Sequence, residues 1–210
     1  MIAPLTLSPA LSRTAGEGVA WRARLPLTAH CSFHKLRQHL RSGGIIAYAT
    51  ESCYGLGCDP RNARAVKRIL QIKSRPQKKG LILIAANIRQ LLPYVTTPGA
   101  AQIKILKQSW PGPTTFLMAA SKRTPRGLRG QHQKIAVRVT AHPDAAGLCA
   151  ALGMALVSTS ANKSGLRPSK NYRDCVKNFG GSVMVLPGRI GKRNRPSTIK
   201  DLESGRITRR

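Results

Sequence analysis

The sequence contains few acidic residues. Only 7 Asp and Glu residues stand against 36 Lys and Arg residues in a chain of 210, which gives a formal net charge of +29. A surface with this excess is electropositive, and its field attracts polyanions and small anions. Nucleic acids, nucleotides and acidic lipid headgroups are therefore candidate partners. The alternative is a basic bias shared by a whole proteome, and charge alone does not separate these explanations.

Paired cysteines and long apolar runs are also missing. The five cysteines are odd in number and include no CxxC pair, so we expect neither a disulfide framework nor a zinc ribbon. No apolar stretch reaches the roughly 18 residues that a membrane span needs, and no secretory signal is evident. These absences predict a cytoplasmic protein with no membrane partner.

Several catalytic signatures are absent as well. The chain has no GxxxxGK[ST], so any ATP would be bound without a Walker loop. GxGxxG and HExxH are likewise absent, and the histidines and cysteines form no spacing typical of a metal site. We therefore predict no metal ligands among the site residues.

The first 31 residues differ from the rest of the chain. They are rich in Pro, Ala, Ser and Arg and show no sustained hydrophobic periodicity. We interpret residues 1–31 as a disordered extension or an over-long start, with a transit-like presequence as the third possibility. Residues 32–210 are predicted to form one domain.

Helical and strand patterns alternate through that domain. Helices are expected from Ser32 to Gly43, from Asn62 towards Pro76, over 99–109 and from Pro143 to Leu152, with a short one near 88–92. Buried strands are expected at 44–49, 81–86, 114–120, 134–139, 154–161, 183–187 and 197–202. The Gly-containing stretch 50–60 is predicted to be a turn. The alternation predicts an α/β or α+β fold around one twisted mixed sheet.

A basic cluster follows the second predicted helix. Lys73 and Arg75 lie two residues apart just before a proline, and Lys79 follows in the same loop. Lys offers a mobile charge and Arg a planar fork, which together suit a triphosphate or a carboxylate. The alternative is that these residues only complement the helix C-terminus.

Hydroxyl and amide side chains follow the strand predicted at 154–161. Ser158, Ser160 and Asn162 lie where that strand runs into a turn. In open α/β sheets, ligands bind beyond the carboxyl ends of strands, and such turns offer N–H groups to anions. An ordinary polar turn is the alternative.

Two further residues lie in or beside predicted strands. Thr115 follows the stiff WPGP bend and could face a pocket, and Arg138 carries a charge inside a strand pattern. If its strand face is buried, Arg138 requires a charged or hydrogen-bonding partner, such as a bound anion.

The order of these blocks resembles one known family. Over about residues 32–210 the chain is similar to the threonylcarbamoyl-AMP synthase family, with its YrdC-like domain. The blocks that carry the resemblance are IIAYATESCYGLGCDP, KSRPQKKGLILIA, WPGPTTF, AVRVTAHP, VSTSANKSG and PSTIKDL. One departure is Ala49, which stands where the family usually has proline.

The resemblance implies a fold, a reaction and a set of site residues. The implied fold is a single YrdC-like domain with an electropositive concave groove. The implied reaction makes threonylcarbamoyl-adenylate and pyrophosphate from L-threonine, bicarbonate or CO2, and ATP, for the modification of adenosine 37 in tRNA. Lys73 and Arg75 would be catalytic. The residues implied to bind substrate or ATP are Thr50, Lys79, Thr115, Arg138, Ser158, Ser160, Asn162, Ser197 and Arg209.

Cofactor and partners follow from the same resemblance. ATP would be a substrate that brings Mg²⁺ without a cage of protein ligands. Partners would be tRNA or double-stranded RNA and the proteins of a tRNA-threonylcarbamoyl transferase complex. Two alternatives stay open: an RNA-binding protein without turnover on the same fold, and another carbamoyl-adenylate chemistry. The latter occurs in larger maturation proteins, whose additional modules this chain lacks.

Overall fold

The structure of the protein is a computed structural model that describes residues 33–209. The expected N-terminal extension, 1–31, and Ser32, where the first helix was expected to begin, lie outside the described residues. The helices are α1 (Phe33–Arg41), α2 (Ala63–Ile72), α3 (Ala100–Ser109), α4 (Arg126–Arg129), α5 (Pro143–Leu152) and α6 (Tyr172–Phe179). The strands are β1 (Ile46–Ala49), β2 (Tyr54–Gly57), β3 (Ile82–Ala85), β4 (Thr114–Ala119), β5 (Lys134–Val139), β6 (Leu156–Ser160), β7 (Met184–Val185), β8 (Thr198–Asp201) and β9 (Ile207–Arg209).

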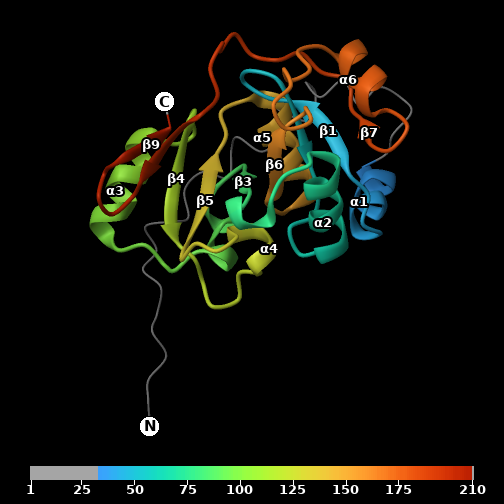
Figure 1. Cartoon of the computed structure of the whole chain (residues 1–210). Coiled ribbons are helices and arrows are strands. Elements are labelled where there is room, and N and C mark those ends of the chain that lie inside the picture. Colours follow the sequence, from blue (N-terminus) through green and yellow to red (C-terminus); the bar gives the residue numbers. More distant parts are fainter. Residues whose placement is uncertain (1–32, 210) are drawn as a thin grey trace.

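The strands form one twisted mixed sheet, as the sequence predicted. Its strand order is β7-β1-β2-β6-β3-β5-β4-β8-β9 (Figure 1). The pairs β1–β7, β3–β5 and β4–β8 are parallel, and the other neighbours are antiparallel. Because β6 pairs with β2 near its carboxyl end and with β3 along the rest of its length, the two halves of the sheet meet at β6.

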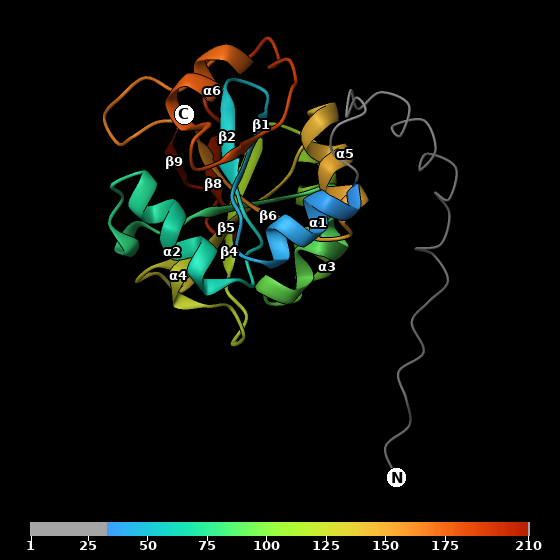
Figure 2. The same ribbon diagram turned by 90° about the vertical axis from the view of Figure 1, so that its right-hand side faces the viewer.

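Helices cover both faces of the sheet. Helices α1 and α5 lie on one side and α2 and α4 on the other (Figure 2). Alternate residues of β1 point into different cores: Ile46 and Tyr48 pack with α1 and α5, whereas Ala47 and Ala49 pack in the larger cluster. Burial on both faces explains why the strands appear in the sequence as short continuous apolar runs.

One predicted turn is wrong. Part of the stretch 50–60 is strand β2, which lies inside the sheet between β1 and β6. Its glycines were interpreted as turn signals, but Gly57 is required for packing. A Cβ atom there would lie 2.7 Å from both the Tyr48 ring and the Val157 carbonyl oxygen. Glycine within a strand often marks such a close approach.

Some smaller elements were not predicted. Helices α4 and α6 and strand β9 had no expected counterpart, and the short helix near 88–92 is two 3₁₀ turns, Ile88–Gln90 and Leu92–Tyr94. Within the described part of the chain, no helix combines the length and apolarity needed to cross a bilayer.

Candidate active site

A cavity of about 500 Å³ lies where the predicted polar blocks meet. Its walls come from the β1–β2 turn, the loop after α2, the carboxyl end of β6, strand β5 and the segment before β8. We call it the cationic cleft, because a single carboxylate, that of Glu51, faces seven cationic residues along its walls. Those seven are Lys73, Arg75, Lys79, Arg138, Lys170, Arg193 and Arg209.

Nearly all the predicted site residues line this cleft. The chain brings together Thr50, Lys73, Arg75, Lys79, Arg138, Ser158, Ser160, Asn162, Ser197 and Arg209. Thr115 is the exception. Its side chain is fully buried, and its hydroxyl donates a hydrogen bond of 2.9 Å to Ser197 Oγ. Thr115 was expected to face a pocket, but it lies behind the wall and supports Ser197.

Lys73 connects two walls of the cleft. Its Nζ donates to the carbonyl oxygen of Ser160 at 2.6 Å and to the carbonyl and Oδ1 of Asn162 at 2.9 and 3.0 Å. These three acceptors match the three N–H donors of an ammonium group. Burial, followed by the charge of Arg75, lowers the pKa of Lys73 to about 8. Lys73 therefore fixes the turn after β6, with only 4% of its surface exposed.

The same turn is held by its own side chains. Ser160 Oγ donates to Asn162 Oδ1 at 2.6 Å, and Asn162 Nδ2 donates to the carbonyls of Lys163 and Leu166. Ser164 donates to the Lys73 carbonyl from both its hydroxyl and its backbone N–H. Contacts in both directions thus join the α2–β3 loop to the turn after β6.

Arg75 is oriented differently from Lys73. Ser74, between them, has a φ of 48°, the left-handed conformation that commonly ends a helix. Arg75 then donates from Nε to the carbonyl of Gly80 at 3.1 Å and from Nη2 to that of Lys79 at 3.3 Å. Burial lowers the pKa of Arg75. Its remaining donors are available on the cleft side, where it is a wall residue.

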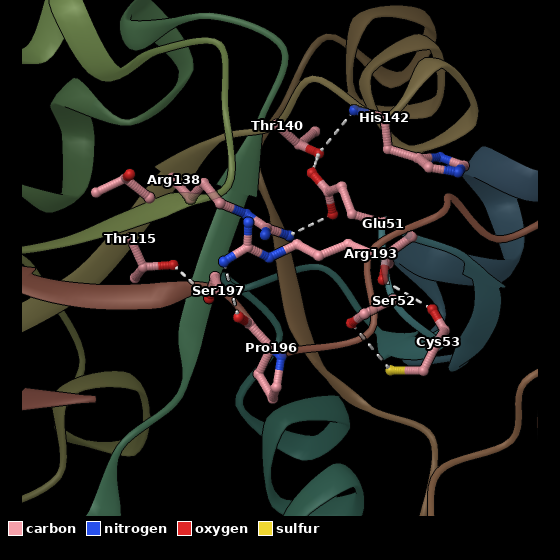
Figure 3. Close-up of polar contacts among 12 residues, drawn as sticks. Glu51, Ser52, Cys53, Thr115, Arg138, Thr140, His142, Arg193, Pro196 and Ser197 are labelled. Atoms are coloured by element: carbon pink, nitrogen blue, oxygen red, sulfur yellow. Dashed lines mark hydrogen bonds and ion pairs between the residues drawn. The ribbon is translucent and has the colours of Figure 1, made fainter. Parts of the chain in front are cut away.

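Arg138 has a protein partner, which the sequence did not reveal. Its Nη2 pairs with Glu51 Oε2 at 3.1 Å, and Thr140 Oγ1 donates to Glu51 Oε1 at 2.7 Å (Figure 3). Burial alone would raise the pKa of Glu51, but Arg138 and Thr140 outweigh it and lower that pKa. The Nε–H of Arg138 and the Oε2 of Glu51 are buried without a hydrogen-bond partner, so the two side chains interact as an ion pair and not through a hydrogen bond.

Arg209 and Ser197 form a hydrogen-bond network in the wall next to β8 and β9. Arg209 donates from Nε and Nη2 to the Ser197 carbonyl at 3.1 and 2.9 Å, and from Nη2 to Ser197 Oγ at 3.0 Å. Burial, then the charges of Arg138 and Arg75, lowers the pKa of Arg209. Since Ser197 Oγ already accepts from Thr115 and Arg209, its own proton can be donated towards the cleft.

Thr50 closes the β1–β2 turn. Its hydroxyl donates to the Cys53 carbonyl at 2.7 Å, and its N–H donates to the same oxygen at 3.1 Å. The hydroxyl oxygen keeps acceptor capacity at the cleft wall.

Three charged wall residues were missed from the sequence: Glu51, Lys170 and Arg193. Glu51 adjoins Thr50 in a block that the sequence singled out, so its position was a usable signal. Arg193 lies among Lys192 and Arg195, where nothing in sequence distinguishes one cation from another.

The cleft offers little to a resident metal ion. Among residues 33–209, no group of three or more His, Cys, Asp or Glu could hold one. The only carboxylate lining the cleft is engaged by Arg138 and Thr140. These residues do not fit a metal held by the protein itself.

A second cavity of about 380 Å³ adjoins the cleft. The two share Arg75, Lys79, Leu81, Ile82 and Arg209 as wall residues. The apolar part of the second cavity's lining includes Leu117, Ala136 and Ile199. Each volume lies within the usual range of roughly 300–1,000 Å³ for small-molecule sites, so together they could accept two substrates.

Known proteins share this sequence and fold. The threonylcarbamoyl-AMP synthase of Chromobacterium violaceum is 59% identical over 175 residues, which cover 83% of this chain and 91% of that protein. The threonylcarbamoyl-AMP synthase of Methylobacillus flagellatus is 56% identical over 174 residues, covering 83% and 97%.

Solved structures agree on the fold. Sua5 of P. abyssi, complexed with L-threonine, aligns with a TM-score of 0.76 at 29% identity and covers 85% of this chain. This chain spans only 54% of that Sua5, about half its length. E. coli YciO aligns with a TM-score of 0.73 at 27% identity, covering 84% of this chain and 87% of YciO. The Sua5/YciO/YrdC family model, described as telomere recombination, matches residues 38–210. With that match over most of its length, the chain belongs to the Sua5/YciO/YrdC family.

Proposed function

We propose that this chain is a threonylcarbamoyl-AMP synthase, a nucleotidyltransferase that joins L-threonine, bicarbonate or CO2, and ATP. Its curated relatives carry that name, and a related Sua5 structure is complexed with L-threonine. The observation that carries the proposal is the cationic cleft, where seven cationic residues and one paired carboxylate surround a cavity of about 500 Å³.

The reaction brings several anions into one place. The amine of threonine and bicarbonate form an N-carboxylate with loss of water. An oxygen of that N-carboxylate attacks the α-phosphorus of ATP, and the bond to the leaving pyrophosphate breaks. The products are threonylcarbamoyl-adenylate and pyrophosphate. Carboxylates and a triphosphate repel one another, so holding them together and neutralising their charge supplies most of the catalysis.

The residues of the cleft divide this work. Arg75 and Lys79 bind the phosphates from the α2–β3 loop, and Arg209 binds the nucleotide from β9. Lys73 is bonded to the turn that carries Ser160 and Asn162, so it holds that turn in place as the nucleotide and amino acid bind. Lys73 was predicted to be catalytic; in this proposal it acts on the substrates through the position of this turn and through its charge.

The remaining predicted residues complete the site. Thr50, Arg138 and Ser158 bind the amino-acid side of the substrates. Ser197 donates its proton to an anionic oxygen, and Thr115 orients Ser197 from behind. Mg²⁺ would be held by the triphosphate of ATP, since the carboxylate that lines the cleft is paired with Arg138. When bound, it neutralises phosphate charge.

Partners and setting follow from the same activity. We assign the catalytic domain to residues 32–210, as predicted from the sequence. The chain works in the cytoplasm with the proteins that transfer the threonylcarbamoyl group to adenosine 37 of tRNA. Its net charge of +29 favours contact with tRNA or another double-stranded RNA.

Substrate omission tests the proposal. Purified protein is mixed with ATP, Mg²⁺, L-threonine and bicarbonate, and pyrophosphate release is followed. Release should require both threonine and bicarbonate and should fall when L-serine replaces L-threonine. A folded protein that releases no pyrophosphate under these conditions would refute the synthase activity. Salt-dependent RNA binding without turnover would then support the RNA-binding alternative.

A further inference from the structure

The chain between β7 and β8 crosses the β1–β2 turn. We call residues 188–196 the crossing segment; it passes over the top of the molecule in Figure 1 before the chain enters β8. Gly191 N–H donates to the Thr50 carbonyl at 2.9 Å, and Arg193 N–H donates to the Glu51 carbonyl at 3.1 Å. These backbone bonds fix the point from which the Arg193 side chain starts.

The contact at Gly191 is close. A Cβ atom there would lie 2.8 Å from the Glu51 carbonyl oxygen and 3.1 Å from its Cα. At the start of the segment, the hydroxyl of Tyr54 donates to the Gly188 carbonyl at 2.8 Å. The crossing segment is therefore pressed against the β1–β2 turn, and its position relative to Thr50 and Glu51 is well defined.

Arg193 directs its guanidinium into the cleft. Figure 3 shows this side chain reaching towards that of Arg138, and both residues line the cavity. Its hydrogen bonds go to backbone carbonyls of its own segment, those of Arg195 at 3.1 Å and Pro196 at 3.5 Å. Within residues 33–209, no carboxylate lies at ion-pair distance from Arg193.

The neighbouring Arg138 is only partly neutralised. Glu51 meets it through one oxygen, and the other oxygen accepts the hydrogen bond from Thr140. Arg138 is 7% exposed, and its Nε–H has no partner. Glu51 is thus shared by Arg138 and Thr140, whereas Arg193, which lines the same cavity, has no ion pair within residues 33–209. Like charges gathered in a partly buried site are stabilised when an anion binds between them.

We propose that Arg193, together with Arg138, binds the carboxylate of the amino-acid substrate. This inference rests on the proposed function. A carboxylate presents two coplanar oxygens, which match the planar donors of a guanidinium. The crossing segment is hydrogen-bonded to Thr50 and Glu51, in the turn assigned to the amino acid. Arg75 and Lys79, which are assigned to the triphosphate, lie on another wall of the cleft.

The test compares two arginines of the same segment. Arg193→Gln removes the charge in the cleft, and Arg195→Gln removes an exposed charge that does not line it. Calorimetry on the full chain at fixed ionic strength measures the binding of L-threonine and of L-threoninamide, whose carboxylate is replaced by a neutral amide. Pyrophosphate release by the wild type is measured in parallel, and circular dichroism verifies that each variant is folded.

We expect Arg193→Gln to weaken L-threonine binding about tenfold, the loss of one charge-assisted hydrogen bond. L-threoninamide should bind the wild type and Arg193→Gln equally, and Arg195→Gln should match the wild type with both ligands. In turnover, the KM for L-threonine should rise in Arg193→Gln while the KM for ATP stays constant.

Contrary outcomes separate the two proposals. Unchanged L-threonine binding in Arg193→Gln, beside an active wild type, would overturn the role of Arg193 alone. So would a rise confined to the KM for ATP, or an equal loss with L-threonine and L-threoninamide. A wild type that neither binds L-threonine nor releases pyrophosphate would overturn the synthase activity and this inference together.

Discussion

The cationic cleft has two walls built in different ways. The α2–β3 loop is hydrogen-bonded to the turn after β6, and all three ammonium donors of Lys73 contribute to that connection. The crossing segment, in contrast, is attached to the β1–β2 turn by backbone bonds, and its Arg193 side chain makes no bond to another wall. The buried charge of Lys73 therefore stabilises the fold, whereas the charge of Arg193 is proposed to bind a ligand.

The same contrast, between a charge that holds structure and a charge that faces the cleft, is found between Lys73 and Arg75. Lys73 and Arg75 are separated only by Ser74, whose left-handed backbone turns the chain between them. Lys73 is 4% exposed and fully hydrogen-bonded, whereas Arg75 bonds only to carbonyls of its own loop and lines the cleft. We therefore expect substitution of Arg75 to impair catalysis and substitution of Lys73 to impair stability first.

The largest effect is expected at Arg75. Arg75→Ala should lower threonine-dependent pyrophosphate release about a hundredfold or more, because it removes a charge placed against the reacting phosphates. Stability should change little, since the lost bonds reach only neighbouring carbonyls. The matched control is Lys78→Ala, which removes an exposed charge of the same loop that does not line the cleft. Equal activity in the two variants would contradict the proposed role of Arg75.

Lys73→Met should act on stability first. The variant leaves the Ser160 and Asn162 carbonyls without their buried donor, so we expect a loss of about 3 kcal/mol in the free energy of unfolding. Urea unfolding measures it, with Lys67→Met on the exposed face of α2 as control. A variant as stable as the control but inactive would show that Lys73 serves the substrates and not the turn.

Glu51→Gln tests the attachment of Arg138. Removing this charge should lower the free energy of unfolding at pH 7 by about 2 kcal/mol, because the buried Arg138 loses its opposite charge and Thr140 then donates to a neutral amide oxygen. Glu203→Gln is the control, because its exposed carboxylate shares Lys134 with Asp201. An exposed pair of this kind contributes less than about 1 kcal/mol.

The pH dependence has a definite sign. The folded-state pKa of Glu51 is lowered from its ordinary value of 4.5, so the unfolded chain binds the proton more readily. The stability difference between wild type and Glu51→Gln should be complete above pH 4.5 and shrink as the pH falls through the lower folded-state pKa. A difference that grows towards acid pH would contradict the pairing with Arg138.

The sequence predicted most of the strands, because strands buried on both faces leave continuous apolar runs. The same pattern singled out Arg138, Ser158, Ser160 and Asn162, since a polar group that interrupts or follows such a run needs a ligand or a partner when it is buried. Thr50, Ser197 and Arg209 were implied only by the family resemblance. The pattern failed at β2, because Gly55 and Gly57 are typical of turns. In the structure β2 pairs with β1 and β6, and Gly57 lies so close to the Tyr48 ring and the Val157 carbonyl oxygen that a side chain would not fit.

Contacts between distant segments could not be predicted. Arg138 was expected to need a partner, but nothing local indicated Glu51. Likewise, Thr115 was expected to face the pocket, because its hydroxyl could bind a ligand. The pairing of β4 with β8 instead brings that hydroxyl to Ser197. Such contacts depend on strand order and register, which a single sequence does not specify.

The smallest effect is expected behind the wall. Thr115→Val removes the donor to Ser197 Oγ at nearly constant volume and should cost about 1 kcal/mol of unfolding free energy. Ser197→Ala should cost somewhat more, since it leaves the buried Thr115 hydroxyl without an acceptor. The double variant should then lose less than the sum of the two by about 1 kcal/mol, the sign of a direct contact. Urea unfolding of all three variants, with Thr114→Val as control on the same strand, measures this coupling. Additive losses would mean that Thr115 does not orient Ser197, and the cleft wall would then depend on Arg209 alone for the placement of that hydroxyl.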